Sequence, residues 1–281
     1  TPKDKTSIPP LIDLPRLLSA TERYLNDDET AEDLKILLAP GSSLGGARPK
    51  ASVRDNDGHL AIAKFSKKDD EFNIVIWEAV TLSLAEMAGL SVARWRLEQI
   101  LEKPVIILRR FDREAQTRIP FLSAMSMLGA KDNEQHSYLE IAYALAQHGS
   151  APKQDMEELW RRIIFTVLVS NADDHLRNHG FMYERHKGWR LSAAYDINPT
   201  PVEIKARILS TSIDFDDPTA SIDTALSVID EFRIKKNRAN EIIREVSAAV
   251  GQWQKIAVRF GLGKREIDRM ASAFEHEDGE K

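Results

Sequence analysis

Apolar residues recur at intervals of three and four over much of the chain, the spacing that places them on one face of an α-helix. Near the start of the sequence this spacing predicts helices over Leu11–Leu25 and Glu29–Leu38, which end before Pro40 and Gly41. The second half contains a longer series of such segments. They are Phe121–Leu128, Ser137–Gln147, Asp155–Val169, Thr219–Glu231, Lys235–Phe260 and Lys264–Phe274.

Between the two helical regions, apolar and polar residues alternate, which is the pattern of a strand with one buried face. Ala51–Arg54 and Leu60–Phe65 flank Asn56-Asp57-Gly58, and this arrangement predicts a strand, a tight turn and a second strand. A helix is expected over Phe72–Ala88, where Gly89 stops it, before two more strands. Those strands are Arg94–Leu101 and Val105–Arg110.

These elements predict an α+β fold with two lobes. Residues 1–112 are expected to form a small mixed α/β N-terminal lobe, and residues 113–281 a larger, all-helical C-terminal lobe. At 281 residues and 31.7 kDa the chain is long enough for two lobes with substantial cores. Its composition, 42% hydrophobic and 30% charged, is typical of a soluble globular protein.

Composition also excludes several classes of site. The chain has no cysteine, so disulfides, thiol nucleophiles and cysteine-ligated metal sites are excluded. It has neither a run of about 18 apolar residues nor a signal segment, and we expect a cytoplasmic protein without membrane association. The net charge of -5 argues against indiscriminate nucleic-acid binding by the chain alone. Thr1 rather than Met opens the sequence, as expected for a processed product or a fragment.

Two polar loops late in the chain carry the most specific chemistry. The apolar run Phe165–Val169 leads into the loop Ser170–Asn178, and after a short hairpin-like return a second apolar segment delivers Asp196. Within the first loop, Asp173 and Asn178 have the spacing Asp-x-x-x-x-Asn. Phosphoryl transfer needs such a set: a carboxylate to accept the hydroxyl proton, and an amide oxygen and a second carboxylate to hold Mg²⁺.

The upstream chain contains the parts that would hold a nucleotide. Gly41–Lys50 is a Gly-rich loop whose backbone amides can approach phosphate groups. The strand ending Ala63-Lys64-Phe65 is close in character to the Val-Ala-Ile-Lys strand, whose lysine pairs nucleotide phosphates. Glu78, in the next helix, stands where a glutamate could pair with Lys64, and the sequence leaves that pairing open. Loop, lysine, glutamate, base and metal ligands stand in kinase order, which predicts a two-lobed kinase-like fold.

Two other interpretations of the polar loops remain open. Asp and Asn are good turn formers, so the loop residues can simply turn the chain. Alternatively, His175 and His179 stand four apart and could share a helix face with Asp173 or Asp174 as ligands of a metal hydrolase. Gly180 directly after the second histidine, and the lack of a glutamate between the two, weigh against that site.

Several separated motifs together resemble the HipA family of bacterial serine/threonine kinase toxins. The similarity runs from about Ser42 to Pro199, and the helical tail is also similar. The motifs are Ser43-Leu44-Gly45-Gly46-Ala47-Arg48-Pro49-Lys50, Ala63-Lys64, Leu108-Arg109-Arg110-Phe111-Asp112-Arg113, Asn171-Ala172-Asp173-Asp174-His175-Leu176-Arg177-Asn178 and Tyr195-Asp196-Ile197.

The resemblance implies the toxin half of a type II toxin-antitoxin system. Such kinases use ATP and Mg²⁺ to phosphorylate an aminoacyl-tRNA synthetase, which halts translation and favours persistence. A helix-turn-helix antitoxin (HipB-like) holds them and binds the operon DNA, so contact with DNA is expected only through that partner. On this basis residues 1–112 are the nucleotide-binding lobe with the Gly-rich loop, and residues 113–281 carry the catalytic and metal-binding loops.

The resemblance also implies a role for each matching residue. Asp173 corresponds to the catalytic base, Asn178 and Asp196 to the Mg²⁺ ligands, and Lys64 to the phosphate contact. Ser43 corresponds to an autophosphorylated serine, with Ser42 as the second choice. The remaining contacts border the nucleotide: His175, Tyr195, and the backbone from Arg109 to Phe111, which meets the adenine.

This chain departs from the family pattern in three places. A Gln-Glu pair is common before the lysine of the Gly-rich loop, where this chain reads Gly-Ala-Arg-Pro-Lys. Arg109 stands where an acidic residue often occurs. Family members also commonly carry an extra N-terminal subdomain, which is expected either to be missing from a fragment or to be supplied by a separate chain.

Two other functions remain alternatives. A small-molecule phosphotransferase of the aminoglycoside kinase kind usually has His-x-Asp, and here Asn171 replaces that histidine. A non-catalytic corepressor that acts with a DNA-binding antitoxin has no need of the retained Lys64, Asp173, Asn178 and Asp196.

Overall fold

The computed structural model describes residues 8, 10–37, 49–67, 70–114 and 117–280. The chain divides into two compact units, and the mixture of helices and strands expected from the sequence is confirmed. Unit 1 comprises Thr1–Ala79 and Ala93–Arg118, and unit 2 comprises Val80–Val92 and Ile119–Lys281. The division falls inside helix α3 (Ile74–Met87).

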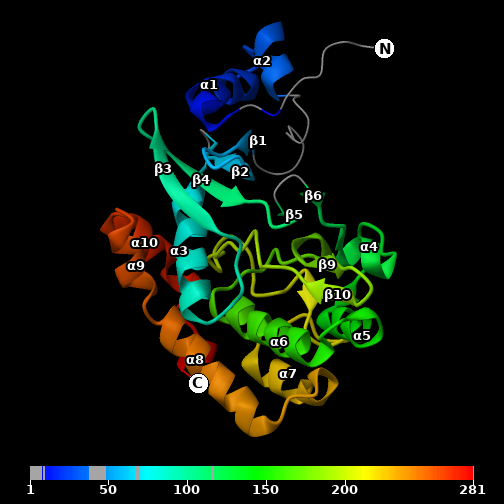
Figure 1. Ribbon diagram of the computed structural model, residues 1–281. Coiled ribbons are helices and arrows are strands. Elements are labelled where there is room, and N and C mark those ends of the chain that lie inside the picture. The colour runs from blue at the N-terminus through cyan, green and yellow to red at the C-terminus, as the bar shows by residue number, and fades with distance from the viewer. Residues whose placement is uncertain (1–7, 9, 38–48, 68–69, 115–116, 281) are drawn as a thin grey trace. The chain divides into compact units, whose positions relative to one another are not determined.

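Unit 1 is built on a four-stranded antiparallel sheet of order β1-β2-β4-β3 (Figure 1). Its strands are β1 (Lys50–Arg54), β2 (Leu60–Phe65), β3 (Trp95–Ile100) and β4 (Lys103–Arg109), and a short pair, β5 (Arg113–Glu114) and β6 (Thr117–Arg118), follows. The predicted turn before β2 is present, with Gly58 at a φ of 81°. Leu101 and Glu102 join β3 to β4 with φ of 49° and 63°, as a two-residue hairpin turn requires.

The core of unit 1 lies on one face of this sheet. The alternation of β2 turns Ala61, Ala63 and Phe65 into a cluster with Leu14, Leu17 and the other buried leucines of α1. Lys64, between them, therefore points to the opposite face. The N-terminal helices are η1 (Leu11–Asp13), α1 (Leu14–Leu25) and α2 (Ala31–Leu37).

Helix α6 is the centre of unit 2. Figure 1 shows it flanked by α5, α7 and α8. Its inner residues Trp160, Ile163 and Phe165 are fully buried, so the helix that leads into the polar loop is fixed on all sides. The helices of this unit are α4 (Ala124–Leu128), α5 (Tyr138–His148), α6 (Pro152–Leu168), α7 (Ile222–Ser227), α8 (Lys236–Val250), α9 (Trp253–Arg259) and α10 (Lys264–Met270).

The expectation that the C-terminal part is all-helical is wrong. Unit 2 contains a three-stranded sheet of order β10-β9-β7 and a parallel pair of two-residue strands. The strands are β7 (Phe121–Ser123), β9 (Gly180–Glu184), β10 (Gly188–Leu191), β8 (His136–Ser137) and β11 (Thr211–Ser212). The predicted helix from Phe121 begins only at Ala124, because the preceding residues pair with β9 and Ser123 caps the helix by accepting the amide of Ser126.

Two other predicted helices are shorter in the structure. The segment from Thr219 starts as helix only at Ile222, after Ser221 accepts the amide of Asp223, and continues as 3₁₀ turn η3 (Ile229–Phe232). The long helix predicted over Lys235–Phe260 is divided into α8 and α9 at Gly251, a residue type with low helix propensity. Shorter 3₁₀ turns are η2 (Leu176–Asn178), η4 (Ala271–Ala273) and η5 (Glu277–Glu280).

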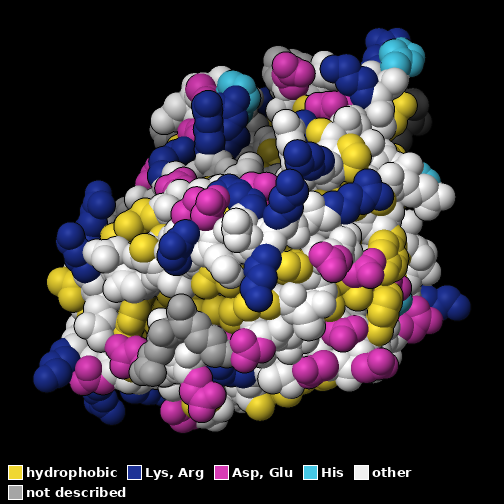
Figure 2. All heavy atoms as spheres, turned by 90° about the horizontal axis from the view of Figure 1, so that it is seen from below, with side chains coloured by type: hydrophobic (Ala, Val, Ile, Leu, Met, Phe, Trp, Pro, Cys, Tyr) yellow, Lys and Arg dark blue, Asp and Glu magenta, His cyan; other side chains and the backbone are white. Residues whose placement is uncertain are grey.

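The surface of the molecule is mixed in charge. On the face that Figure 2 presents, acidic and basic side chains are interspersed and hydrophobic side chains lie between them. Within the described residues, no helix combines the length and the apolar content needed to cross a membrane.

Candidate active site

The polar loop of unit 2 begins where α6 ends, at a left-handed residue. Ser170 has a φ of 49°, and its amide bonds to Val167 O at 3.3 Å while the next amide, of Asn171, bonds to Thr166 O at 3.0 Å. This pair of bonds is the Schellman motif, whose left-handed position is usually glycine. A serine there costs about 1 kcal/mol or more, and such strain is concentrated at functional sites.

The loop is then fastened to the chain that follows Asp196. Asn171 Oδ1 accepts the amide of Asn198 at 3.3 Å, and Ser170 O accepts the amide of Thr200 at 3.2 Å. A third bond joins the amide of Ser210 to Ala172 O at 3.2 Å. The two polar loops predicted from the sequence are therefore one hydrogen-bonded assembly.

The adjacent acidic residues Asp173 and Asp174 have opposite environments. The Asp173 side chain is 77% exposed, and its ion-pair partner in the described part of the chain is Lys205, at 3.7 Å. Asp174 is buried and accepts hydrogen bonds from Tyr138 Oη and, at 3.3 Å, from Thr166 Oγ1. The exposed residue is thus the one placed to meet a substrate.

Asp174 is a charged anchor. Burial raises the pKa of its carboxyl, but the His179 ring, whose Nε2 lies 3.2 Å away, and the hydrogen bonds that it accepts outweigh burial, and its pKa falls below the usual value. Burial and the Asp174 charge raise the pKa of Tyr138 well above its ordinary value, so the phenol remains a donor. Tyr138 and His179 also meet edge to face, with ring centroids 5.3 Å apart.

Asn178 presents an oxygen at the other end of the loop. Its amide nitrogen donates to Asp173 O at 3.3 Å, which leaves the carboxamide oxygen available to a cation. The side chain is otherwise well enclosed, with 8% of the residue exposed. The same amide group therefore closes the loop and presents a hard oxygen ligand.

The arrangement of the histidines does not support the hydrolase interpretation. His175 and His179 flank the 3₁₀ turn η2 in extended conformations, so they do not share an α-helix face. His179 is turned inward to Asp174. Across the described ranges, no group of three or more His, Asp or Glu side chains is placed to hold a metal ion.

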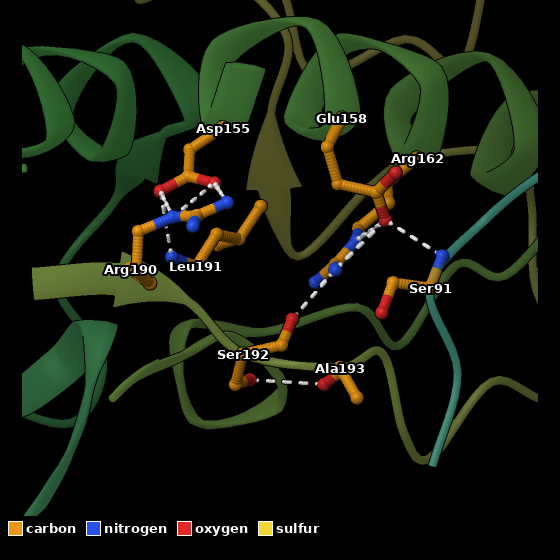
Figure 3. Close-up of polar contacts among 8 residues, drawn as sticks. All are labelled: Ser91, Asp155, Glu158, Arg162, Arg190, Leu191, Ser192 and Ala193. Carbon is orange, nitrogen blue, oxygen red and sulfur yellow. Dashed lines mark hydrogen bonds and ion pairs between the residues drawn. The ribbon is translucent and has the colours of Figure 1, made fainter. Parts of the chain in front are cut away.

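Strand β10, which leads to the second loop, is held by the first turns of α6. Figure 3 shows Asp155 receiving both Arg190 and the amide of Leu191. Arg190 Nε lies 2.9 Å from Asp155 Oδ2 and Nη2 lies 3.0 Å from Oδ1, while the Leu191 amide donates to Oδ2 at 3.1 Å. Three donors on one buried carboxylate fix the end of the strand.

A second contact from α6 continues this support along the chain (Figure 3). Arg162, 4% exposed, donates to Ser192 O at 2.6 Å and to Glu158 Oε1 at 2.9 Å. The same Glu158 oxygen accepts the amide of Ser91 at 3.1 Å. The backbone four residues before Asp196 is thereby attached to the buried part of α6.

Asp196 itself has a left-handed backbone. Its φ is 60°, and Asn198 Nδ2 donates to Oδ1 at 3.4 Å. The neighbours are fixed by Thr81 Oγ1, which donates to Ile197 O at 2.6 Å, and by Tyr195 Oη, which donates to Arg177 O at 2.7 Å. Burial, and then the Asp196 charge, raise the pKa of Tyr195, so this phenol keeps its proton and joins the chain around Asp196 to the loop Ser170–Asn178.

A small cavity lies behind the two loops. Its lining includes Arg162, Asp174, Asn178 and Tyr195, and its volume of about 10 Å³ has room for about one water molecule. A nucleotide needs a pocket of several hundred cubic ångströms. The cavity is therefore too small for a nucleotide, and it is a gap in the packing of the residues that hold the two loops.

In unit 1, the pairing that the sequence left open is present. Lys64 Nζ on β2 donates to Glu78 Oε1 on α3 at 2.6 Å, and the two side chains are 14% and 4% exposed. Kinases require this lysine–glutamate pair for an active arrangement. The ion pair presents an oriented ammonium on the sheet face opposite the α1 core.

The other residues expected near the nucleotide are placed as follows. The amides of Arg109 and Arg110 donate to Arg94 O at 2.8 Å and Leu60 O at 2.9 Å, so both are engaged in the sheet. The Arg109 side chain lies 3.6 Å from Asp57. Ser42 and Ser43 lie outside the described residues.

Sequence reasoning missed three kinds of residue. Asp174 is indistinguishable from Asp173 by type, and only burial separates them. Lys205 lies far along the chain from Asp173 and belongs to no motif, so no sequence signal pointed to it. Asp155 and Arg162 belong to a helix that carries several other charged residues, so no sequence signal marked them as buried.

The family model described as HipA-like C-terminal domain matches residues 42–253. That stretch contains all the candidate site residues. Two curated relatives carry the name "Putative kinase". One, from Haemophilus influenzae, is 28% identical over 197 residues, which are 60% of this chain and 57% of that protein. The other, from Sinorhizobium fredii, is 25% identical over 138 residues, 44% of this chain and 33% of that protein.

Solved structures show the same fold. HipA of Shewanella oneidensis, determined with HipB and its operator DNA, has a TM-score of 0.67 at 18% identity and covers 82% of this chain and 62% of its own. The Helicobacter pylori proinflammatory kinase CtkA has a TM-score of 0.55 at 15% identity and covers 83% of this chain and 92% of its own. This chain thus spans less than two thirds of the Haemophilus relative and of Shewanella HipA.

Proposed function

Because the chain belongs to the family of HipA-like C-terminal domains, we propose that it is an ATP-dependent serine/threonine protein kinase that requires Mg²⁺. The observation that carries this proposal is the exposed carboxylate of Asp173 on a loop that is anchored by hydrogen bonds and whose neighbouring residues Ala172 and Asp174 are buried. The same assembly presents the amide oxygen of Asn178 and the carboxylate of Asp196. A turn-forming role alone does not need such support.

The side chains present suit the metal that a kinase needs. Asn178 and Asp196 supply only oxygen ligands, and oxygen ligands in small number are typical of Mg²⁺ sites with phosphates. When bound there, Mg²⁺ would neutralise charge on the nucleotide phosphates. The left-handed backbone of Asp196 is the strained feature expected of a residue with this role.

The reaction follows from the roles of the side chains. Asp173 accepts the proton of a substrate hydroxyl while the hydroxyl oxygen bonds to the γ-phosphorus of ATP. The bond from that phosphorus to the bridging oxygen breaks, and ADP leaves with the electron pair. Lys64, oriented by Glu78, holds the nucleotide phosphates. No redox or covalent enzyme intermediate is involved.

Substrate and partners are proposed at a finer level. The substrate would be a translation component, most simply an aminoacyl-tRNA synthetase, and Ser43 or Ser42 would be the autophosphorylation site. A HipB-like helix-turn-helix antitoxin is the proposed partner, and DNA would be contacted only through it. The support for this partner is that the similar HipA of Shewanella oneidensis was solved in complex with HipB and operator DNA.

The test is labelling of proteins in a bacterial lysate with radioactive ATP and Mg²⁺, followed by mass spectrometry of the labelled bands. Wild-type chain should label at least one protein on serine or threonine. Asp173→Asn should label none, because an amide cannot accept the hydroxyl proton. Asp230→Asn is the matched control, since Asp230 is an exposed acidic residue of η3 far from the loop in sequence.

The outcomes separate the candidate functions. Equal labelling by the wild type and by Asp173→Asn would overturn the assignment of the base. Phosphate transfer to small molecules of the lysate, with no protein labelled, would favour a small-molecule phosphotransferase. If the wild type transferred nothing, catalysis by this chain would be refuted.

A further inference from the structure

We propose that Lys205 is a second catalytic residue, whose ammonium group contacts the phosphoryl group as it passes from ATP to the hydroxyl held by Asp173. This inference rests on the proposed kinase function and adds a residue to its site. Nothing in the motif order pointed to Lys205. The contacts of its ammonium group are what assign the role.

The ammonium group lies beside the base. Lys205 Nζ donates to Ala172 O at 2.9 Å and to Ser210 Oγ at 3.3 Å, and it lies 3.7 Å from Asp173 Oδ1. A lysine ammonium has three N–H donors. Two of them bond to neutral acceptors, so the third remains for the carboxylate or for a phosphoryl oxygen.

The position of Lys205 is fixed by its surroundings. The turn that carries it is closed by the amides of Ile204 and Lys205, which both bond to Pro201 O, at 2.9 and 3.2 Å. At the start of that turn, the amide of Val202 donates to Ser272 Oγ at 3.2 Å. A cation held at both its backbone and its head group needs little reorganisation when the reaction occurs.

A purely structural ion pair is a poor explanation of this contact. The side chains of Lys205 and Asp173 are 41% and 77% exposed, and exposed ion pairs add little to stability. The anchoring bonds go to Ala172 O, the carbonyl directly before the base, so the lysine is held to the catalytic loop itself. Its side chain is 41% exposed, so the head group remains accessible to a substrate.

The chemistry of transfer needs a cation at this place. The oxygen of a substrate hydroxyl that is hydrogen-bonded to Asp173 lies about 2.6–3.2 Å from the carboxylate oxygen. The phosphorus atom that this hydroxyl attacks is one bond further away. An ammonium group 3.7 Å from the same carboxylate oxygen is within reach of that phosphoryl group. Negative charge is spread over its three equatorial oxygens in the transition state. The hydroxyl proton goes to Asp173.

The chain offers a clean test because it contains no cysteine. Lys205→Cys introduces a single thiol, which 2-bromoethylamine converts into a side chain of nearly lysine length with an ammonium end. Iodoacetamide converts the same thiol into a neutral amide. Lys187→Cys, in the exposed turn between β9 and β10, receives the same reagents as the matched control.

The assay is the initial rate of phosphate transfer from saturating Mg-ATP to lysate protein. The initial rate of Lys205→Cys should be about 10²- to 10³-fold lower than that of the wild type, as expected for removal of one preorganised donor. ATP affinity by calorimetry and the unfolding temperature should stay close to wild type. Aminoethylation should restore the rate to within about tenfold, and amidation should not. Lys187→Cys should be active in all three forms.

Two further variants keep the test decisive if Lys205→Cys folds poorly. Lys205→Arg should retain most of the rate because it keeps the charge, and Ser210→Ala should cost less than about tenfold because it removes only an anchor. Equal rescue by the neutral amide, or a Ser210→Ala loss as large as that of Lys205→Cys, would overturn the catalytic role. So would wild-type rates in Lys205→Cys. If the wild type transferred no phosphate, the kinase proposal and this inference would both fail.

Discussion

At the scale of single residues, the site depends on the difference between two adjacent aspartates. Asp173 is exposed, whereas Asp174 is buried under Tyr138, Thr166 and His179. Substitution of either aspartate should abolish phosphate transfer, but for different reasons. In the proposed mechanism Asp173 accepts the substrate proton, whereas Asp174 holds the backbone that presents Asp173.

The two aspartates should therefore separate in stability measurements. Asp173→Asn should leave the free energy of unfolding within about 0.5 kcal/mol of wild type, as for most exposed positions. Asp174→Asn removes the charge from a buried cluster and should lower the free energy of unfolding by about 3 kcal/mol. Urea denaturation followed by circular dichroism measures both. Equal losses would contradict the assignment of base and anchor.

Asp174 also predicts how stability depends on pH. Its folded-state pKa is lowered, so its contribution is fully present above the ordinary aspartate pKa of about 3.9 and is lost as pH falls through the folded-state pKa. Wild type should thus lose stability more steeply below about pH 4 than Asp174→Asn. Denaturation curves at a series of acidic pH values test this, and parallel pH profiles for the two proteins would refute it.

The backbone of Asp196 allows its charge to be tested apart from its conformation. Asp196→Asn keeps a residue that tolerates the left-handed region, while Asp196→Ala does not. Both should weaken Mg²⁺-dependent ATP binding at least about tenfold, or about 1.4 kcal/mol, and only the alanine variant should also lower the unfolding temperature. Calorimetry with Mg²⁺ and with a chelator provides the measurement. ATP affinity unchanged by chelator and by both substitutions would place the nucleotide elsewhere.

At the scale of elements, α6 supports both polar loops. The sequence predicted this helix, the strand–turn–strand before it and the position of Lys64, because 3.6- and 2-residue periodicities report directly which face is buried. It did not predict β7 or β9. The three residues Phe121–Ser123 continue the apolar spacing of α4, so only their pairing with β9 identifies them as a strand. Likewise, no local pattern reveals that Asp155 and Arg162 reach the end of β10.

The support from α6 can be tested by removing one contact. Asp155→Ala leaves Arg190 and the Leu191 amide without their buried acceptor. It should lower the free energy of unfolding by about 3 kcal/mol. It should also weaken Mg-ATP binding, since β10 leads to Asp196. Glu184→Ala is the matched control: that residue lies 3.8 Å from the same Arg190 but is 41% exposed, so its loss should cost under about 1 kcal/mol. Similar losses from the two variants would contradict the role of α6.

At the scale of the whole molecule, each compact unit carries its own set of candidate residues. Lys64 and Glu78 belong to unit 1, and Asp173, Asn178 and Asp196 to unit 2. The motif order in the sequence predicts Lys64, Asp173, Asn178 and Asp196 as candidates because each motif is local, and it leaves the pairing of Glu78 with Lys64 open. The substrate and partner surfaces are not local, and the chain spans only part of its curated relatives.

Autophosphorylation is the prediction that concerns the whole molecule. Protein incubated with Mg-ATP should gain phosphate on Ser43 or Ser42 and then bind ATP more weakly, because a phosphate adds about 1.5 to 2 negative charges that repel the nucleotide. Asp173→Asn protein should gain none. Peptide mass spectrometry and calorimetry on the same sample provide the readout. A phosphorylated form with unchanged ATP affinity would refute the regulatory role.

The attachment of both loops to α6 has a consequence for local opening. The amide of Asn171 donates to Thr166 O in the last turn of α6, and that of Thr200 donates to Ser170 O just after the helix. The amide of Ala194 donates to Ser91 O, beside the Glu158 contact. Because α6 is buried from Leu159 to Leu168, we expect that these amides are not released singly without disturbing the same support. In hydrogen exchange they should behave as one foldon, with similar protection and a common response to urea. Asp173, the proposed base, and Asp196, the proposed metal ligand, would then lose their geometry together. The protein would lose its capacity for phosphate transfer in one step.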